Sequence, residues 1–187
     1  MAYFPMMVDL ESKRVLVIGG GEEGKKKVEI LYQFGAVITL IAINAKDEAK
    51  KLAATYEERE FEDRDILEND YTLIVAATDD EELNSHISEL AAATKTPVNI
   101  VDNSKLCTFI FPAIIKKGDV VCSVSSGGKS PYVAQYVKSL IEEVLPKNIA
   151  EINDKMGEYR IKAKQELENA AERRAYLKLK FEELLNK

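Results

Sequence analysis

The sequence predicts an α/β fold, in which a parallel sheet carries helices on both faces and is followed by a hairpin, a helix and an α-helical tail. Two observations predict the sheet: apolar, strand-like runs alternate with helical patterns over the first hundred residues, and a glycine-rich turn joins the first strand to the first helix. Uninterrupted apolar strands are typical of a parallel sheet that is covered on both sides. The 187 residues are enough for one such domain with an appendage.

The strands of the sheet are expected in five apolar runs, at residues 15–18, 36–41, 56–61, 71–77 and 97–101. Helices are expected between them, at residues 25–34, 45–54 and 80–93. In the third of these helices, Leu83, Ile87 and Ala91 recur at helical spacing, which places them on one face. Gly35 follows the first helix and is typical of a residue that ends a helix.

The turn after the first strand has glycine at its first, third and sixth positions, Gly19, Gly21 and Gly24. This spacing between a strand and a helix is what a dinucleotide-binding βα turn needs. Gly19 would allow a sharp exit from the strand, Gly21 the approach of a pyrophosphate to the backbone, and Gly24 close packing of the helix on the sheet. The candidate phosphate site comprises the whole turn, Gly19, Gly20, Gly21, Glu22, Glu23 and Gly24. The alternative is a turn with a purely structural role.

Three further residues follow strands, at the sheet edge where open α/β folds bind their cofactor. Asn44 stands after the second strand, where an acid often holds the ribose; it could bind a hydroxyl or begin the next helix. Because no acid stands there, the residues alone do not decide whether the cofactor is NAD or NADP. Thr78 is a candidate cofactor residue, unless Thr78 or Asp79 merely caps the next helix. Asp102 is placed to transfer a proton, unless it forms an Asx turn.

The pattern changes after the last strand of the sheet. Residues 107–115 and 119–125 are two β-rich runs, which predict a hairpin. Residues 116–118, two lysines and a glycine, are expected in its turn. Residues 147–187 are mostly charged and favour helices, which predicts an α-helical tail that packs on its own domain or on a partner subunit.

The loop after the hairpin is a candidate anion site. It combines small residues, a lysine and the start of a helix, and its candidate binding residues are Ser125, Ser126, Gly127 and Lys129. Ser130 suits the N-cap position and Pro131 the first helical position, so a helix is expected from there to about residue 145. The alternative is a simple entry into that helix.

Composition excludes several classes of function. A net charge of −6 and a pI near 5.1 argue against a general nucleic-acid binder. No apolar run approaches 18 residues and the start of the chain has no leader pattern, so neither a membrane span nor a signal peptide is expected. Cys107 and Cys122 are expected as buried reduced thiols, consistent with a cytoplasmic protein. His86 is the only histidine, and no cluster has the spacing of a metal site.

Taken together, these motifs resemble the precorrin-2 dehydrogenase family, the dehydrogenase part of sirohaem synthases. The matching stretches cover roughly residues 3 to 146 in the family's order: Phe4-Pro5, residues 8–10 and 15–21, residues 76–79 with Asn84, residues 98–102, residues 109–113 and residues 125–131. The tail past residue 147 matches only in being helical. Two departures occur, Gly24 where the family often has alanine and Lys26 where arginine is common.

The resemblance implies oxidation of precorrin-2 to sirohydrochlorin with NAD as the hydride acceptor. It assigns Asp102 as the catalytic general base, and Ser126 to a tetrapyrrole-binding loop that is phosphorylated in some members. It implies a homodimer and three parts: an NAD-binding domain at residues 1–112, a dimerisation and tetrapyrrole-binding segment at 113–146, and a helical domain at 147–187. Two alternatives stay open: a bifunctional dehydrogenase and sirohydrochlorin ferrochelatase, and a non-catalytic regulator that binds the nucleotide or the tetrapyrrole.

Overall fold

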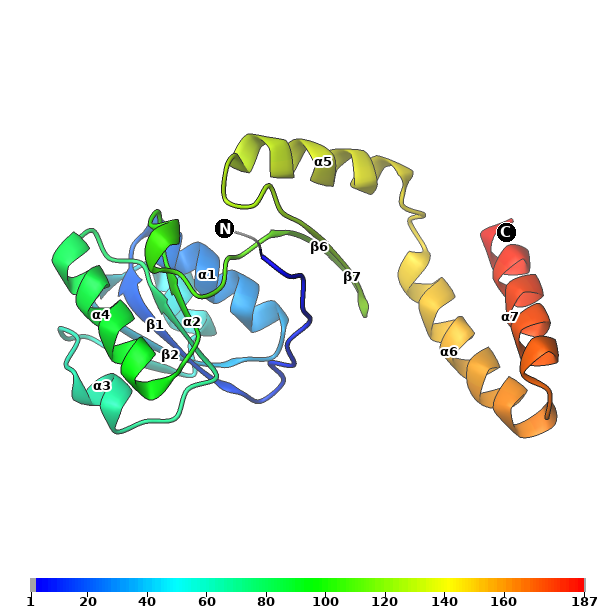
Figure 1. Cartoon of the computed structure of the whole chain (residues 1–187), viewed down its shortest axis with the longest axis horizontal. Coiled ribbons are helices and arrows are strands. Elements are labelled where there is room, and N and C mark those ends of the chain that lie inside the picture. Colours follow the sequence, from blue (N-terminus) through cyan, green and yellow to red (C-terminus); the bar gives the residue numbers. More distant parts are fainter. Residues whose placement is uncertain (1–2, 187) are drawn as a thin grey trace. The chain divides into compact units, whose positions relative to one another are not determined.

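The computed structural model describes residues 3–186 and divides into two compact units, Met1–Phe111 and Pro112–Lys187. The first unit is an α/β domain and the second consists of a hairpin and three helices (Figure 1).

The first unit alternates strands and helices along the chain. Its strands are β1 (Arg14–Gly20), β2 (Val37–Ala45), β3 (Thr55–Glu57), β4 (Leu73–Ala76) and β5 (Val98–Ile100). Its helices are α1 (Glu22–Gln33), α2 (Asp47–Leu52), α3 (Arg64–Leu67) and α4 (Glu81–Thr94), with a 3-10 turn at Ser104–Leu106. The strands form one sheet in the order β3-β2-β1-β4-β5, and every neighbouring pair is parallel.

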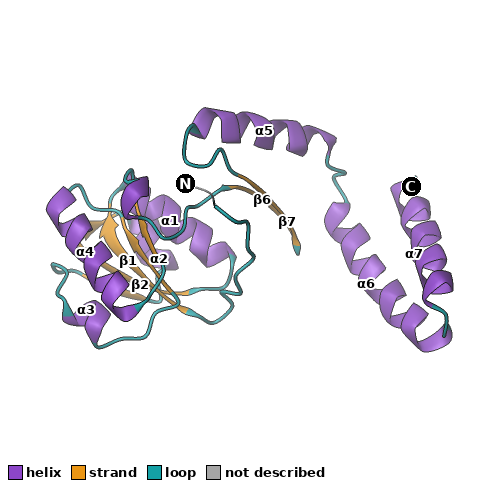
Figure 2. Cartoon of the chain, viewed as in Figure 1, coloured by secondary structure: helices purple, strands orange, loops and turns teal. Residues whose placement is uncertain are grey.

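The core lies on both faces of this sheet, because successive residues of a strand point to opposite sides. On β1, Val15 and Val17 pack with Val28 of α1 in a cluster that also includes Ala49 of α2. Leu16 and Ile18 pack on the other face, in a cluster with Ile66 of α3 and with Ile87 and Ala91 of α4. Each fully buried Leu, Ile or Val stabilises the fold by about 2 kcal/mol. The predicted Rossmann-like fold with helices on both faces is therefore confirmed (Figure 2).

The region between β3 and β4 differs from the expectation. The predicted strand at 56–61 is only Thr55–Glu57, and the unpredicted short helix α3 follows it. An ion pair bridges this part of the chain: the Arg59 guanidinium donates to both carboxylate oxygens of Asp65, at 2.8 and 2.7 Å. Asp65 also accepts from the backbone N–H of Glu62 at 2.8 Å, and its side chain is almost fully buried.

The second unit begins with the predicted hairpin, formed by antiparallel strands β6 (Ala113–Lys117) and β7 (Val120–Val124). Its turn is tighter than expected. Lys116 and Lys117 pair with Val121 and Val120 within the strands, so their placement in the turn is wrong, and Gly118 provides the left-handed residue with φ 58°. Cys107 lies before the hairpin and outside any strand.

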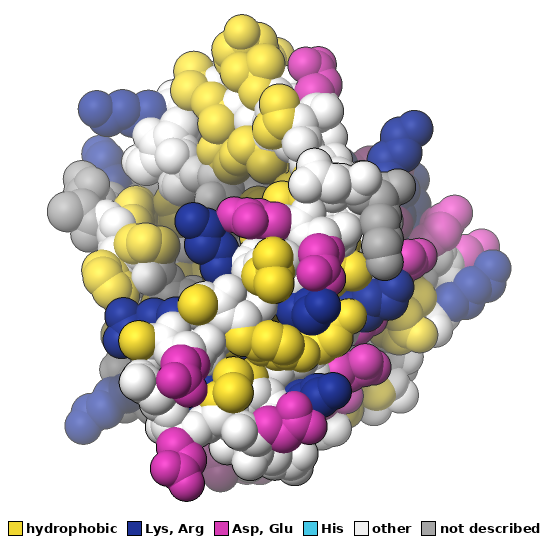
Figure 3. All heavy atoms as spheres, turned by 90° about the vertical axis from the view of Figure 1, so that its right-hand side faces the viewer, with side chains coloured by type: hydrophobic (Ala, Val, Ile, Leu, Met, Phe, Trp, Pro, Cys, Tyr) yellow, Lys and Arg dark blue, Asp and Glu magenta, His cyan; other side chains and the backbone are white. Residues whose placement is uncertain are grey.

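Three helices follow the hairpin: α5 (Pro131–Val144), α6 (Ile149–Glu166) and α7 (Ala170–Leu185). The Ser130 hydroxyl accepts from the Val133 N–H at 3.3 Å and Pro131 is the first helical residue, as predicted. Helices α6 and α7 contact each other, with the rings of Tyr159 and Tyr176 edge to face at 6.1 Å. The molecular face in Figure 3 mixes charged side chains of both signs with hydrophobic ones. Among residues 3–186, no helix combines the length and the apolarity needed to cross a bilayer.

Candidate functional site

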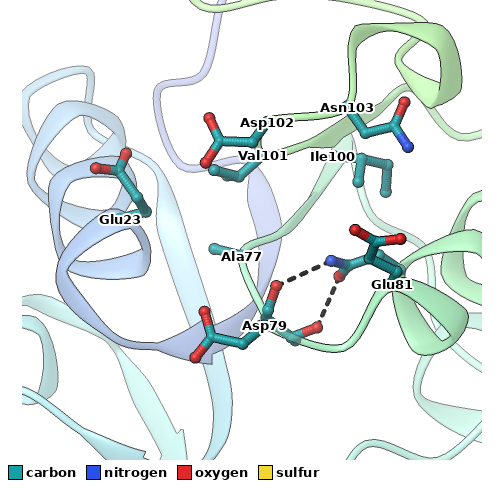
Figure 4. Close-up of a pocket in the computed structure, with 10 residues that line it drawn as sticks. Glu23, Ala77, Asp79, Glu81, Ile100, Val101, Asp102 and Asn103 are labelled. Atoms are coloured by element: carbon teal, nitrogen blue, oxygen red, sulfur yellow. Dashed lines mark hydrogen bonds between the residues drawn. The ribbon is translucent and has the colours of Figure 1, made fainter.

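A pocket of about 260 Å³ opens in the first unit, at the carboxyl ends of β4 and β5 and beside the start of α1 (Figure 4). It is lined by Glu23, Ala77, Thr78, Asp79, Glu81, Asn84, Ile100, Val101, Asp102 and Asn103. The chain runs from β1 outward to β2 and β3 on one side and to β4 and β5 on the other. In open α/β sheets, ligands bind at such a reversal of strand order.

The glycine turn forms one wall of this site. Three of its glycines, Gly19, Gly20 and Gly24, lie so close to neighbouring backbone atoms that a side chain would not fit, and Gly20 packs in this way against Asn44 and Ala45 of β2. Gly19 has φ 101°, and a Cβ on it would overlap the carbonyl oxygen of Ala77. A Cβ on Gly24 would overlap the carbonyl oxygen of Gly19, which locks the first turn of α1 against the end of β1. Gly21 has no atom within 4 Å of its Cβ position, so the space above its backbone is open to a ligand.

Helix α1 starts at the pocket with N–H groups that no side chain caps, because Gly21 occupies the N-cap position. The two glutamates of its first turn are paired with lysines. Glu22 contacts Lys46 at 2.9 Å and Lys25 at 3.1 Å, and these hydrogen bonds lower the pKa of Glu22 to about 2. Glu23 contacts a lysine of the next turn at 2.6 Å. These pairings offset the negative charge beside a helix terminus that favours anions.

Asn44 lies within β2 and is exposed, because that strand runs past its predicted end to Ala45. The alternative that Asn44 caps the next helix is wrong, since the N-cap of α2 is Lys46. The Lys46 N–H donates to the carbonyl oxygen of Gly20 at 3.0 Å. The end of β2 thus lies against the glycine turn, with Asn44 in place of the acid that often holds a ribose.

Thr78 is tied to Asn84, a residue that the sequence had not marked as part of the site. The Thr78 hydroxyl donates to Asn84 Oδ1 at 2.8 Å, and Asn84 Nδ2 donates to the Thr78 carbonyl at 2.9 Å. The cap of α4 is Asp80, which accepts from the Leu83 N–H at 3.0 Å, so the alternative that Thr78 or Asp79 caps this helix is wrong. The sequence had named Asn84 only among the residues that carry the family resemblance, and the physical signal for it was an asparagine among the apolar positions of α4.

Asp102 lies two residues beyond β5, with its carboxyl group on the pocket and its backbone left-handed at φ 60°. Among residues 3–186 its carboxyl accepts no hydrogen bond, so the Asx-turn alternative does not describe it. The turn is held instead by Cys107, whose thiol accepts from the Ile100 N–H at 3.1 Å and donates to the Ile100 carbonyl at 3.2 Å. Burial raises the pKa of the Cys107 thiol, which suits this structural role.

Lys27 is a cation that the sequence had not marked. It lies one helical turn after Glu23, with its ammonium 4.6 Å from the centre of the Phe111 ring. Burial lowers the pKa of Lys27, against the opposing effect of the negative charges of Glu23 and Asp102. The acidic pocket therefore has a partly desolvated cation near the Asp102 carboxyl.

The predicted anion loop belongs to the second unit. Gly127 and its neighbour Gly128 are left-handed, at φ 66° and 79°, and the Ser125 hydroxyl accepts from the Gly127 N–H at 3.1 Å. The Ser126 hydroxyl accepts from the Ser130 N–H at 2.9 Å, and Lys129 is exposed. The loop thus presents a lysine and a helix start on a self-supported backbone.

Both cysteines are free thiols and both are half-buried, less buried than predicted. His86 is exposed and contacts Asp63 at 2.8 Å, outside the pocket. Within residues 3–186, no group of three His, Cys, Asp or Glu side chains is arranged to hold a metal ion.

A doubly wound parallel sheet, a glycine turn at the first βα junction and a pocket at the strand-order reversal define a dinucleotide-binding domain. The chain belongs to the NAD(P)-binding family whose model, described as "Putative NAD(P)-binding", matches residues 6–113.

Curated relatives extend the similarity over almost the whole chain. The siroheme synthase of Ruthia magnifica subsp. Calyptogena magnifica is 36% identical over 185 residues, which are 97% of this chain and 39% of that protein. The siroheme synthase of Mannheimia succiniciproducens is 36% identical over 94% of this chain and 37% of its own length. The chain therefore spans about two fifths of the length of the curated relatives it matches.

Among solved structures, SirC, a precorrin-2 dehydrogenase, matches with a TM-score of 0.72 and 20% identity over 98% of both chains. This likeness shows that the fold is shared along the full chain. Together with the curated relatives, it confirms the family resemblance drawn from the sequence motifs.

Proposed function

We propose that this protein is an NAD-dependent precorrin-2 dehydrogenase of the cytoplasm, which forms sirohydrochlorin for sirohaem or cobalamin biosynthesis. One observation carries the proposal: the pocket joins the start of the glycine-turn helix, at Glu23, to the Asp102 carboxyl within one unit. An oxidation that removes a hydride and a proton needs both a dinucleotide and a proton acceptor at one place.

The residues present fit a dinucleotide. The open space over Gly21 and the uncapped N–H groups of α1 suit a pyrophosphate. Thr78 lies on the pocket, and Asn44 is exposed at the strand end where a ribose is held. The bound nicotinamide would supply the hydride acceptor. The choice of NAD over NADP rests on the family resemblance.

Asp102 is the proposed general base. Its carboxyl lines the pocket and is not engaged by a hydrogen-bond donor among residues 3–186, so its oxygens are available to a substrate. Precorrin-2 would lose one hydride to the nicotinamide and one proton to this carboxylate, which balances the two-electron oxidation. The ammonium of Lys27, which interacts electrostatically with Asp102, adds a cation beside this carboxyl.

The second unit would bind the substrate's carboxylates and a second copy of the chain. The Ser125, Ser126, Gly127 and Lys129 loop offers a cation and a helix start to a polyanion. Helix α5 carries an exposed apolar stripe, the α5 stripe, made of Tyr132, Val133, Tyr136, Val137, Leu140 and Val144. Because monomers rarely expose such a patch, we propose that it is the homodimer contact. In this proposal, residues 113–146 serve dimerisation and tetrapyrrole binding, and 147–187 form a helical domain.

The decisive test is NADH formation from precorrin-2 under anaerobic conditions, followed by its absorbance. Stoichiometric NADH and sirohydrochlorin are expected. Precorrin-2 that binds without NADH appearing would overturn the proposal in favour of a non-catalytic regulator.

The curated relatives are named siroheme synthases, and this observation favours iron insertion as a second activity. Adding ferrous iron to the completed reaction and recording the sirohaem spectrum tests it. A sirohaem spectrum that forms faster with the protein than without it would establish the bifunctional enzyme.

A further inference from the structure

The side chain of Asn84 is one of the few polar side chains in the core, with 6% of its surface exposed. Both ends of its amide bind the same residue. Asn84 Oδ1 accepts from the Thr78 hydroxyl at 2.8 Å, while Asn84 Nδ2 donates to the Thr78 carbonyl at 2.9 Å. A buried amide that closes two hydrogen bonds on one residue fixes both the side chain and the backbone of that residue.

These bonds use the only hydrogen that the Thr78 hydroxyl can donate. A hydroxyl has a single hydrogen, and the short bond to Asn84 uses it. The same oxygen also accepts from the Asp80 N–H at 3.3 Å. The hydroxyl of Thr78 therefore holds the turn between β4 and α4 together, and it has no further hydrogen to donate to a cofactor.

That turn is also a wall of the nucleotide site. The carbonyl oxygen of Ala77, next to Thr78, lies where a Cβ of Gly19 would be, and the Thr78 nitrogen lies 3.0 Å from the same position. The Ala77 N–H donates to the Ile18 carbonyl at 2.7 Å, so the turn is bonded to the end of β1 as well. Because these backbone atoms are in close contact, a displacement of Thr78 would also displace the glycine turn.

We propose that Asn84 is a positioning residue of the dinucleotide site, which acts by latching Thr78 and thereby holding the β4–α4 turn against Gly19. In this arrangement the backbone of Thr78 shapes the dinucleotide site, and its hydroxyl only binds Asn84. The two hydrogen bonds between Thr78 and Asn84 are called the latch below. The inference deepens the proposed function, but it concerns dinucleotide affinity and so is separate from the oxidation of precorrin-2.

The test is titration of the full chain with NADH and with NADPH, followed by nucleotide fluorescence. Asn84→Ala and Thr78→Val should each raise the Kd of the bound dinucleotide about tenfold, as expected for the loss of one or two buried hydrogen bonds. The double variant should be no weaker than the single ones, because residues that act as one unit are not additive. Thr78→Ser keeps the hydroxyl and should restore near-native affinity. Asn84→Asp, with the same shape but no amide donor, replaces Asn84→Ala if the latter does not fold.

The matched control is Asn99→Ala. Asn99 is equally buried, at 6% exposed, and its amide donates to the Phe109 carbonyl at 3.1 Å, but it does not line the pocket. The Asn99→Ala variant should lose thermal stability as Asn84→Ala does, but it should bind the dinucleotide with the affinity of the parent. Equal losses of affinity in both, or an unchanged Kd in Asn84→Ala, would overturn the latch. If the dehydrogenase assay fails while the latch variants still lose affinity, only the proposed reaction is wrong.

Discussion

The α-carbon of Gly24 faces the carbonyl oxygen of Gly19 across the first turn of α1, with no room between them for a methyl group. Gly24→Ala must therefore push the helix away from the strand, although the family often has alanine at this position. We expect a loss of about 1–3 kcal/mol in the free energy of unfolding, together with weaker NADH binding. Thermal denaturation and NADH titration measure the two effects.

Gly21→Ala is the control for this change. The Cβ position of Gly21 is free of neighbours, and its backbone at φ −67° suits any residue. Stability should stay within about 0.5 kcal/mol of the parent, while NADH affinity falls because the methyl group occupies the space assigned to the pyrophosphate. Native stability in Gly24→Ala would contradict the geometry, and native affinity in Gly21→Ala would contradict the cofactor assignment.

Asp102→Asn should lower the turnover of precorrin-2 by about 10²-fold or more while NADH binding persists. Asparagine is the suitable replacement because it tolerates the left-handed backbone that Asp102 adopts at φ 60°. Asp102→Ala would add backbone strain of about 1 kcal/mol to the loss of the carboxylate. Single-turnover rates at saturating NAD measure the effect, and an unchanged rate would remove Asp102 from the mechanism.

Lys129→Glu should weaken sirohydrochlorin binding about tenfold, because it puts a negative charge into the loop assigned to the tetrapyrrole carboxylates. The NADH affinity should not change. Lys155→Glu, an exposed charge reversal on α6, is the control for net charge. Parallel titrations with both ligands separate these effects, and equal losses for both ligands would indicate misfolding.

The Arg59–Asp65 ion pair should make stability depend on acid pH. Burial would raise the pKa of Asp65, but the hydrogen bonds from Arg59 and from the Glu62 N–H outweigh it, and the pKa lies below 3.8, its ordinary value. The ionised Asp65 carboxylate therefore makes its full contribution to the free energy of unfolding at pH values well above 3.8. This contribution is lost as the pH falls through the lower pKa that Asp65 has in the folded state.

Asp65→Asn should cost about 3 kcal/mol at neutral pH, since it leaves Arg59 without its buried partner. At pH values below the ordinary pKa of an aspartate, the free energies of unfolding of Asp65→Asn and of the parent should become more similar. Urea unfolding across this range measures it. Asp63→Asn, which breaks the exposed contact to His86, should cost less than about 1 kcal/mol. A pH-independent difference for Asp65→Asn would indicate a packing effect rather than an ion pair.

The α5 stripe should determine the oligomeric state. Tyr136 is 65% exposed and Leu140 is 42% exposed, so glutamates at both positions would charge the proposed contact without touching the unit's own core. We expect Tyr136→Glu combined with Leu140→Glu to convert a dimer into a monomer in light scattering. Gln135→Glu, an exposed polar position of the same helix, should leave the dimer intact. A parent protein that is itself monomeric would refute the homodimer.

Local patterns explain why so much of the fold could be predicted. The alternation of apolar runs with helical periodicity depends on neighbours a few residues apart, and so do the spacing of Gly19, Gly21 and Gly24 and the cap at Ser130. These features were confirmed as elements. Boundaries failed where a specific pair of side chains, which no periodicity marks, bridges the chain, as Arg59 and Asp65 do between β3 and α3.

The sequence by itself determined the class of this protein: an α/β chain whose glycine turn, Asp102 and Ser125–Pro131 loop follow the order of one family. Only the tertiary structure decided what surrounds them. It placed Lys27 over Phe111 near Asp102, and it set the carbonyl oxygen of Ala77 against Gly19 of the glycine turn. The physical reason is that a helix or a turn is fixed by local spacing, whereas the partner of a buried polar group is fixed by the packing of elements that are far apart in the chain.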